Sequence, residues 1–117
     1  MESPLLVKSK QFALDIIKVC NKVKSEKRES VLTNQLIRSG TSVGANIREA
    51  KYAHSKADFT AKLQIALKEC YETEYWIEIT HKANLITEDT AKIVLHDCGS
   101  IRKMLISSVN TAKENTK

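Results

Sequence analysis

The sequence has little of what turns, sheets and membrane spans require. It holds one proline and three glycines in 117 residues, too few for the many hairpins of a sheet-rich fold. No apolar run approaches the length of a membrane span, and no signal peptide precedes the first charged residues. We therefore expect one helical domain, 1–117, in the cytoplasm and without membrane contact.

The residue groupings that mark most catalytic and metal sites are also missing. Cys20, Cys70 and Cys98 form no Cys-x-x-Cys pair, so neither a disulfide framework nor a zinc site is predicted. There is no glycine-rich phosphate loop and no nucleophile elbow. Aromatic residues make up 5% of the chain, which leaves little material for stacking on bases. We expect no enzyme and no cofactor.

Helical bundles often hold metals, so the di-iron possibility requires a separate test. A ferritin-like site needs two Glu-x-x-His motifs and two further glutamates. Glu78 and His81 form one such motif, and the sequence contains no second. The triplet 96–98, His-Asp-Cys, contains the residue types of a catalytic triad, but adjacent residues on a helix point in different directions. No metal site and no catalytic residue is predicted.

Positive charge is in excess and unevenly distributed. The net charge is +5, with seven basic and four acidic residues in 1–29, three and one in 30–54, and four and five in 55–84. Such a basic balance permits an anionic partner such as nucleic acid. It also serves solubility alone in many small proteins, and both interpretations stay open.

Hydrophobic periodicity predicts four amphipathic helices, at about 4–24, 31–52, 56–83 and 88–109. Residues 25–29 are predicted to form a loop because they include no apolar residue, and residues 110–117 are predicted to be a frayed tail. The predicted helix caps are Ser3, Ser30, Ser55 and Thr87. Four such helices with short connections indicate an all-α, up-down-up-down four-helix bundle.

The most unusual stretch is 35–50, in the second predicted helix. Gly40 and Gly44 stand one turn apart among serine, threonine and alanine, and such small residues let another helix come close. One interpretation is tight helix packing with solvated flanks. The other is a buried polar network of Arg38, Asn46 and Glu49 at a subunit interface.

Two glutamates on the third predicted helix share a face. Glu69 and Glu72 are three residues apart and are predicted to pair with Arg38 or Arg48 of the second helix, within the bundle or across an interface. A plain solvated face is the alternative, and a paired-carboxylate catalytic site would need a cleft and an acid–base partner.

These two stretches resemble a family of small bacterial proteins known as four helix bundle proteins, some of them encoded within intervening sequences of 23S ribosomal RNA genes. The family's central signature is matched at Gln35, Leu36, Arg38, Ser42, Val43, Ala45, Asn46, Ile47 and Glu49. A second block is matched at Phe59, Ile65, Ala66, Leu67, Glu69, Glu72 and Glu74. Many relatives have proline where this chain has Gly44. Glycine at this position keeps the bend but lacks the rigidity that proline gives it.

The resemblance implies a left-handed bundle that assembles into homo-oligomers, as ring-shaped pentamers. The chain is similar to the accessory subunits of diversity-generating retroelements, whose basic pentamers bind nucleic acid and a reverse transcriptase. The residues that would form an interface or polar network are Arg38, Gly40, Ser42, Gly44, Asn46, Glu49, Glu69 and Glu72.

Two functional hypotheses follow. The first is a non-enzymatic homo-oligomer that binds RNA or DNA through a basic surface. Its candidate phosphate contacts are Lys8, Lys18, Lys22, Arg48 and Lys51. The second is a scaffold that ignores nucleic acid and recruits a protein partner, such as a reverse transcriptase, with exposed Trp76 and Tyr75 as anchors.

Overall fold

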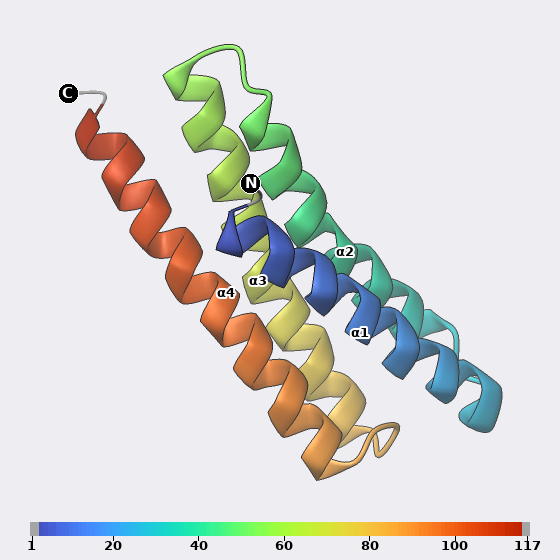
Figure 1. Ribbon diagram of the computed structural model, residues 1–117. Coiled ribbons are helices and arrows are strands. Elements are labelled where there is room, and N and C mark those ends of the chain that lie inside the picture. Colours follow the sequence, from blue (N-terminus) through green and yellow to red (C-terminus); the bar gives the residue numbers. More distant parts are fainter. Residues whose placement is uncertain (1–2, 116–117) are drawn as a thin grey trace.

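The computed structural model describes residues 3–115, and this part of the chain folds into four long helices without strands (Figure 1). They are α1 (Pro4–Lys27), α2 (Val31–Lys51), α3 (Lys56–Lys82) and α4 (Glu88–Asn115). Consecutive helices run in opposite directions. Helix α1 packs against α2 and α4, and α3 packs against the same two helices. The predicted all-α four-helix bundle is confirmed.

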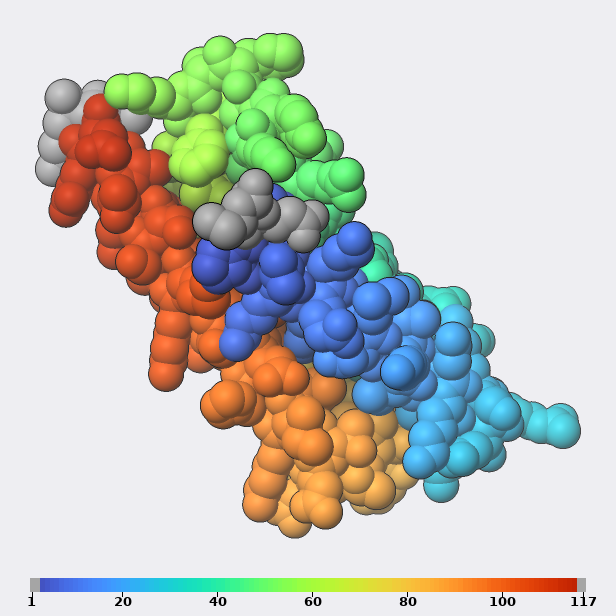
Figure 2. Space-filling model, in the orientation of Figure 1, coloured from blue at the N-terminus to red at the C-terminus, as the bar shows by residue number. Residues whose placement is uncertain are grey.

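The helices are staggered along a body of 49 × 25 × 20 Å. Helix α1 begins part-way along the bundle, so the end of α2, the start of α3 and the end of α4 project beyond it (Figures 1 and 2). Because α1 and α2 are antiparallel, the last turns of α2 still lie beside the first turns of α1, and the candidate site lies there.

Three of the four predicted helix starts are confirmed by cap hydrogen bonds. The Ser3 hydroxyl oxygen accepts from the Leu6 N–H at 3.1 Å, with proline in the first turn of α1. At α3, the Ser55 oxygen accepts from the Asp58 N–H at 3.0 Å. At α4, the oxygen of Thr87 accepts from the N–H of residue 90 at 3.1 Å. Each bond satisfies a donor that a helix start leaves free.

Ser30 occupies the N-cap position of α2, as predicted, but its side chain makes no cap hydrogen bond. The Glu29 carboxylate accepts instead from the N–H groups of Leu32 at 2.8 Å and Thr33 at 3.0 Å. Partial burial acts to raise the pKa of Glu29, but these donors outweigh it and lower that pKa below its ordinary value. A charged cap therefore begins α2.

Two predicted helix ends were too early. Helix α1 continues through Lys27 and ends at Arg28, which has a left-handed backbone (φ 54°) and donates its N–H to the Lys24 carbonyl at 3.1 Å. Helix α4 continues through Asn115, whereas a frayed tail had been predicted from residue 110. Residues 116–117 of that tail lie outside the described residues. Both extensions consist largely of polar residues that form exposed helix, so loss of the apolar period did not mark the end of the helix.

The core is formed by the predicted apolar stripes. The α4 stripe is buried throughout, at Ala91, Val94, Cys98, Ile101, Leu105 and Val109. All three cysteines are free thiols with no exposed surface. Burial raises the pKa of Cys20 to about 12, and a hydrogen bond with Cys70 together with burial raises the pKa of Cys98. These thiols are therefore small core residues rather than nucleophiles.

Candidate nucleic-acid interface

The small-residue face of α2 packs against α1 of the same chain. A Cβ atom built on Gly40 would lie 3.1 Å from Cγ2 of Ile16, a fully buried side chain. A Cβ on Gly44 would lie 3.4 Å from the Ser9 carbonyl oxygen, at ordinary contact distance. The predicted close helix approach is confirmed at Gly40, where any larger residue would press on the core.

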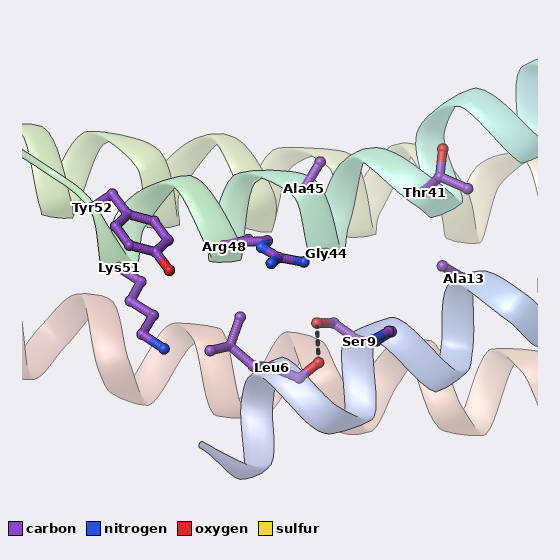
Figure 3. A pocket seen from close by; sticks show the side chains of 10 residues that line it. Leu6, Ser9, Ala13, Thr41, Gly44, Ala45, Arg48, Lys51 and Tyr52 are labelled. Atoms are coloured by element: carbon purple, nitrogen blue, oxygen red, sulfur yellow. Dashed lines mark hydrogen bonds between the residues drawn. The ribbon is translucent and has the colours of Figure 1, made fainter. Parts of the chain in front are cut away.

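Around Gly44 the small residues leave a groove on the surface between α1 and α2 (Figure 3). It has a volume of about 240 Å³. Tyr52 and Lys51 lie at one end in this view, and Thr41 and Ala13 lie at the other. The remaining lining residues are Leu6, Ser9, Lys10, Gly44, Ala45 and Arg48.

The lining of this groove carries positive charge only. Lys10 comes from α1, Arg48 and Lys51 come from α2, and no aspartate or glutamate lines it. Between residues 3 and 115, none of these three cations takes part in an ion pair (Glu49 and Asp58 border Arg48 in a separate depression). We call the groove with these three side chains the α1–α2 groove.

The structure brings together two of the five predicted phosphate contacts. Arg48 and Lys51 line the α1–α2 groove. Lys8, Lys18 and Lys22 do not line it, although Lys18 and Lys22 are exposed on α1. Lys22 instead borders a depression that also contains two glutamates, at 26 and 88. The three lysines therefore contribute charge elsewhere on α1.

Sequence reasoning missed Lys10. Its place in the groove depends on how α1 is aligned against α2, and the spacing of residues within one helix does not give that alignment. The available signal was its neighbour, Ser9, a buried polar residue that faces Gly44. A small polar residue in an apolar stripe marks a place where another backbone comes close.

Between α2 and α3, in contrast to the α1–α2 groove, a basic residue is paired with acidic residues. Arg38 forms ion pairs with Glu69, at 3.5 Å, and with Glu72. The Glu72 carboxylate also accepts from the Trp76 indole N–H at 3.0 Å. Pairing of the two glutamates with Arg38 within the chain is confirmed, and no ion pair to Arg48 forms in the described residues.

A further ion pair, between α3 and α4, was not predicted. Arg102 Nε donates to Glu74 Oε1 at 2.8 Å, and both side chains are about three-quarters buried. The hydrogen bond with Glu74 raises the pKa of Arg102. The signal was a glutamate within the apolar stripe of α3, which needs a partner when it is partly buried.

The residues of the suggested polar network do not join one another within the chain. Asn46 donates to the Ser42 carbonyl at 2.8 Å, and Ser42 donates to the Arg38 carbonyl at 2.7 Å. These are bonds to the backbone of their own helix. Glu49 is exposed. A network between Arg38, Asn46 and Glu49 would therefore require a second subunit, and it stays a prediction.

The predicted exposure of Trp76 was wrong. Its side chain is partly buried against the core and is tied to Glu72. Tyr75 is exposed, at 54%, with its ring edge-on to Trp76 at 5.0 Å between centroids. Position on a helix predicts which way a residue points, but a large ring can still fold back toward its neighbours.

Neither a metal-binding group nor the 96–98 triad is assembled in residues 3–115. This part of the chain holds no group of three His, Cys, Asp or Glu side chains that could bind a metal ion, and none of its helices is long and apolar enough to cross a membrane. His96 and Cys98 do not converge, because the His96 side chain is 83% exposed while Cys98 is fully buried. The α1–α2 groove is a basic feature of this surface whose lining includes no acidic residue.

Comparison with known proteins agrees with this architecture. The model of the family described as 23S rRNA-intervening sequence protein matches residues 2–107. A solved structure from Bacteroides thetaiotaomicron, described as a protein with unknown function from the S23 ribosomal protein family, is 45% identical. That match covers 90% of this chain and 97% of the other, with a TM-score of 0.88. No curated protein matches the chain. The chain belongs to the 23S rRNA-intervening sequence protein family.

Proposed function

We propose that this protein is a non-enzymatic, homo-oligomeric RNA-binding protein that contacts the phosphate backbone through the α1–α2 groove. The observation that carries the proposal is the group of unpaired cations there, Lys10, Arg48 and Lys51, with no acidic residue among the lining side chains. A phosphate is the common ligand of such a group, because it offers charge and hydrogen-bond acceptors to several cations at once.

Pairing separates the groove cations from Arg38 and Arg102, and the absence of acidic lining residues separates them from Lys22. Arg38 and Arg102 already hold carboxylates, so binding a phosphate would mean giving those up. Lys10 and Arg48 form no ion pair within residues 3–115. Binding a phosphate would therefore cost them their hydration but no existing ion pair. Lys8, Lys18 and Lys22 add long-range attraction along α1.

Assembly would strengthen a weak single site. A ring of five left-handed bundles, each with net charge +5, would carry +25 in all, and several grooves engaging one RNA would raise the avidity. Light scattering on the purified protein tests this part of the proposal. A monomer at all concentrations would remove the multivalent argument and leave the groove as a single weak site. We expect the protein to act in the cytoplasm.

The test of RNA binding is a titration of a structured RNA and a matched duplex DNA across salt concentrations. The logarithm of the affinity should fall steeply with the logarithm of salt, by about 0.7–0.9 for each phosphate contact. Tighter binding of the RNA than of the DNA would support the assignment of RNA as the ligand. Failure to bind either one at low salt would contradict the proposal and leave the charge with a solubilising role.

A protein scaffold is the second candidate, and exposed side chains on α3 favour it. Ile65, Tyr71 and Tyr75 are 41%, 53% and 54% exposed, and aromatic residues of this kind anchor protein interfaces. Tyr75 takes the anchoring role that the sequence had given to Trp76. If a protein partner is found, Tyr75→Ala should weaken its binding, and unchanged binding would remove α3 from the interface.

A further inference from the structure

We propose that the α1–α2 groove binds an unpaired nucleic-acid strand, with one base stacked on the ring of Tyr52 and the adjoining phosphates held by Arg48, Lys51 and Lys10. The inference rests on the proposed nucleic-acid binding and names the form of nucleic acid that the groove would take. It has three steps: the place of Tyr52, the stacking that an unpaired base allows and the arrangement of the cations.

Tyr52 is an exposed ring on a fixed backbone. It directly follows the last turn of α2, and its N–H is bonded to the Glu49 carbonyl at 3.0 Å. Its side chain is 67% exposed and lines the groove. The other two tyrosines, Tyr71 and Tyr75, lie on α3 and do not line it. Of the three, Tyr52 is therefore the one positioned to meet a ligand held by the groove cations.

The exposed ring at the end of the groove favours a single strand. Small residues form the floor of the groove at Gly44 and Ser9, so the backbone of a strand can come close to the cations beside the ring. Bases in a duplex are also stacked on each other, so their faces are closed to an aromatic side chain. An unpaired base offers both faces, and proteins recognise such bases by stacking on aromatic rings.

The cations stand where a strand leaving Tyr52 would pass. Lys51 Nζ lies over one face of the Tyr52 ring, 5.9 Å from its centre, so a base would stack on the opposite face. Arg48 lies further along the groove, toward Gly44 (Figure 3). Lys10 approaches from α1. A positively charged track that ends at an exposed aromatic ring is the combination that single-strand binding proteins use.

The experiment compares three labelled RNA ligands of equal length: an oligouridine, an abasic strand with the same phosphates, and a duplex. The protein variants are Tyr52→Ala, Tyr52→Phe and the control Tyr75→Ala, which removes an exposed ring from α3, outside the groove. Loss of one stacked base should weaken oligouridine binding by about tenfold or more for Tyr52→Ala. Binding of the abasic strand and the duplex should not change, Tyr52→Phe should bind as wild type, and so should Tyr75→Ala.

Other results would overturn the inference. If Tyr52→Ala binds oligouridine as tightly as wild type, or weakens all three ligands equally, no base stacks on this ring. In that case binding by wild type would still support the proposed function, so the two can fail separately. If wild type binds none of the three ligands at low salt, both fail. Circular dichroism of each variant verifies that the exposed substitution leaves the bundle folded.

Discussion

Helix α2 faces two neighbours, and the two faces treat positive charge differently. Toward α3, Arg38 is held by two glutamates from the adjacent helix. Toward α1, Arg48 and Lys51 line a groove whose lining has no acid. The same helix thus carries a cation used for the fold and cations left available for a ligand. The lesson is that net charge does not separate these two kinds of cation, whereas the side chains around each cation do.

The glycines of the α1–α2 face should give the largest effect. Gly40→Val should lower the free energy of unfolding by about 3 kcal/mol, because its side chain would be forced against the buried Ile16. The matched change Gly44→Ala meets only an ordinary contact with Ser9, and it should raise stability by up to about 1 kcal/mol through helix propensity. Urea unfolding measures both changes. A free energy of unfolding for Gly40→Val equal to that of wild type would contradict the close packing.

The α2–α3 ion pairs should contribute less. Arg38→Gln should cost about 1 kcal/mol or less, because its side chain is 47% exposed and water screens the pairs. A double-mutant cycle with Glu72→Gln isolates the coupling between the two side chains. Coupling near zero would show that the pair forms without stabilising the bundle. The two faces of α2 would then differ in the arrangement of their side chains but not in the energy of an ion pair.

Glu29 should give the smallest effect, and one that depends on pH. Its carboxylate is occupied by two backbone N–H groups at the start of α2. Its pKa is lowered in the folded chain, so its contribution is present above the unfolded pKa and is lost as pH falls through the folded pKa. Glu29→Gln should therefore cost a few tenths of a kcal/mol, up to about 1, at neutral pH.

Unfolding measured across pH tests this sign. The difference between wild type and Glu29→Gln should shrink as the solution becomes acidic and the carboxyl group is protonated. A difference that stays constant from neutral to acidic pH would show that charge at this cap does not matter. Asp58, near the start of α3, is available as a comparison, because within residues 3–115 its carboxylate accepts one hydrogen bond, from the His54 N–H at 3.3 Å.

The sequence predicted the helices well because each one is long and carries a regular apolar stripe. It predicted the close approach at Gly40 for a related reason, since small residues at helical spacing have few other uses. The pairing of Arg38 with Glu69 and Glu72 was also predicted. In each case, the signal is the spacing of residues within one helix or the strong tendency of oppositely charged side chains on two helices to pair.

What the sequence did not predict depends on the alignment of one helix against another, or on competition between local groups. Lys10 belongs to the groove only because of how α1 lies on α2. Ser30 is the N-cap residue of α2, but the longer side chain of Glu29 reaches forward and accepts from the free N–H groups of Leu32 and Thr33 in its place. Arg28 ends α1 with a left-handed backbone, which glycine or asparagine would have signalled more clearly.

The central claim is that unpaired cations of the α1–α2 groove bind the phosphate backbone, and one pair of variants tests it most directly. Arg48→Gln and Arg38→Gln remove the same charge from the same helix, but only Arg48 lines the groove. RNA binding titrated across salt should show a shallower slope for Arg48→Gln, by about 0.7–0.9, and a wild-type slope for Arg38→Gln. Equal loss of slope in both variants would contradict the claim and leave net charge as the source of binding.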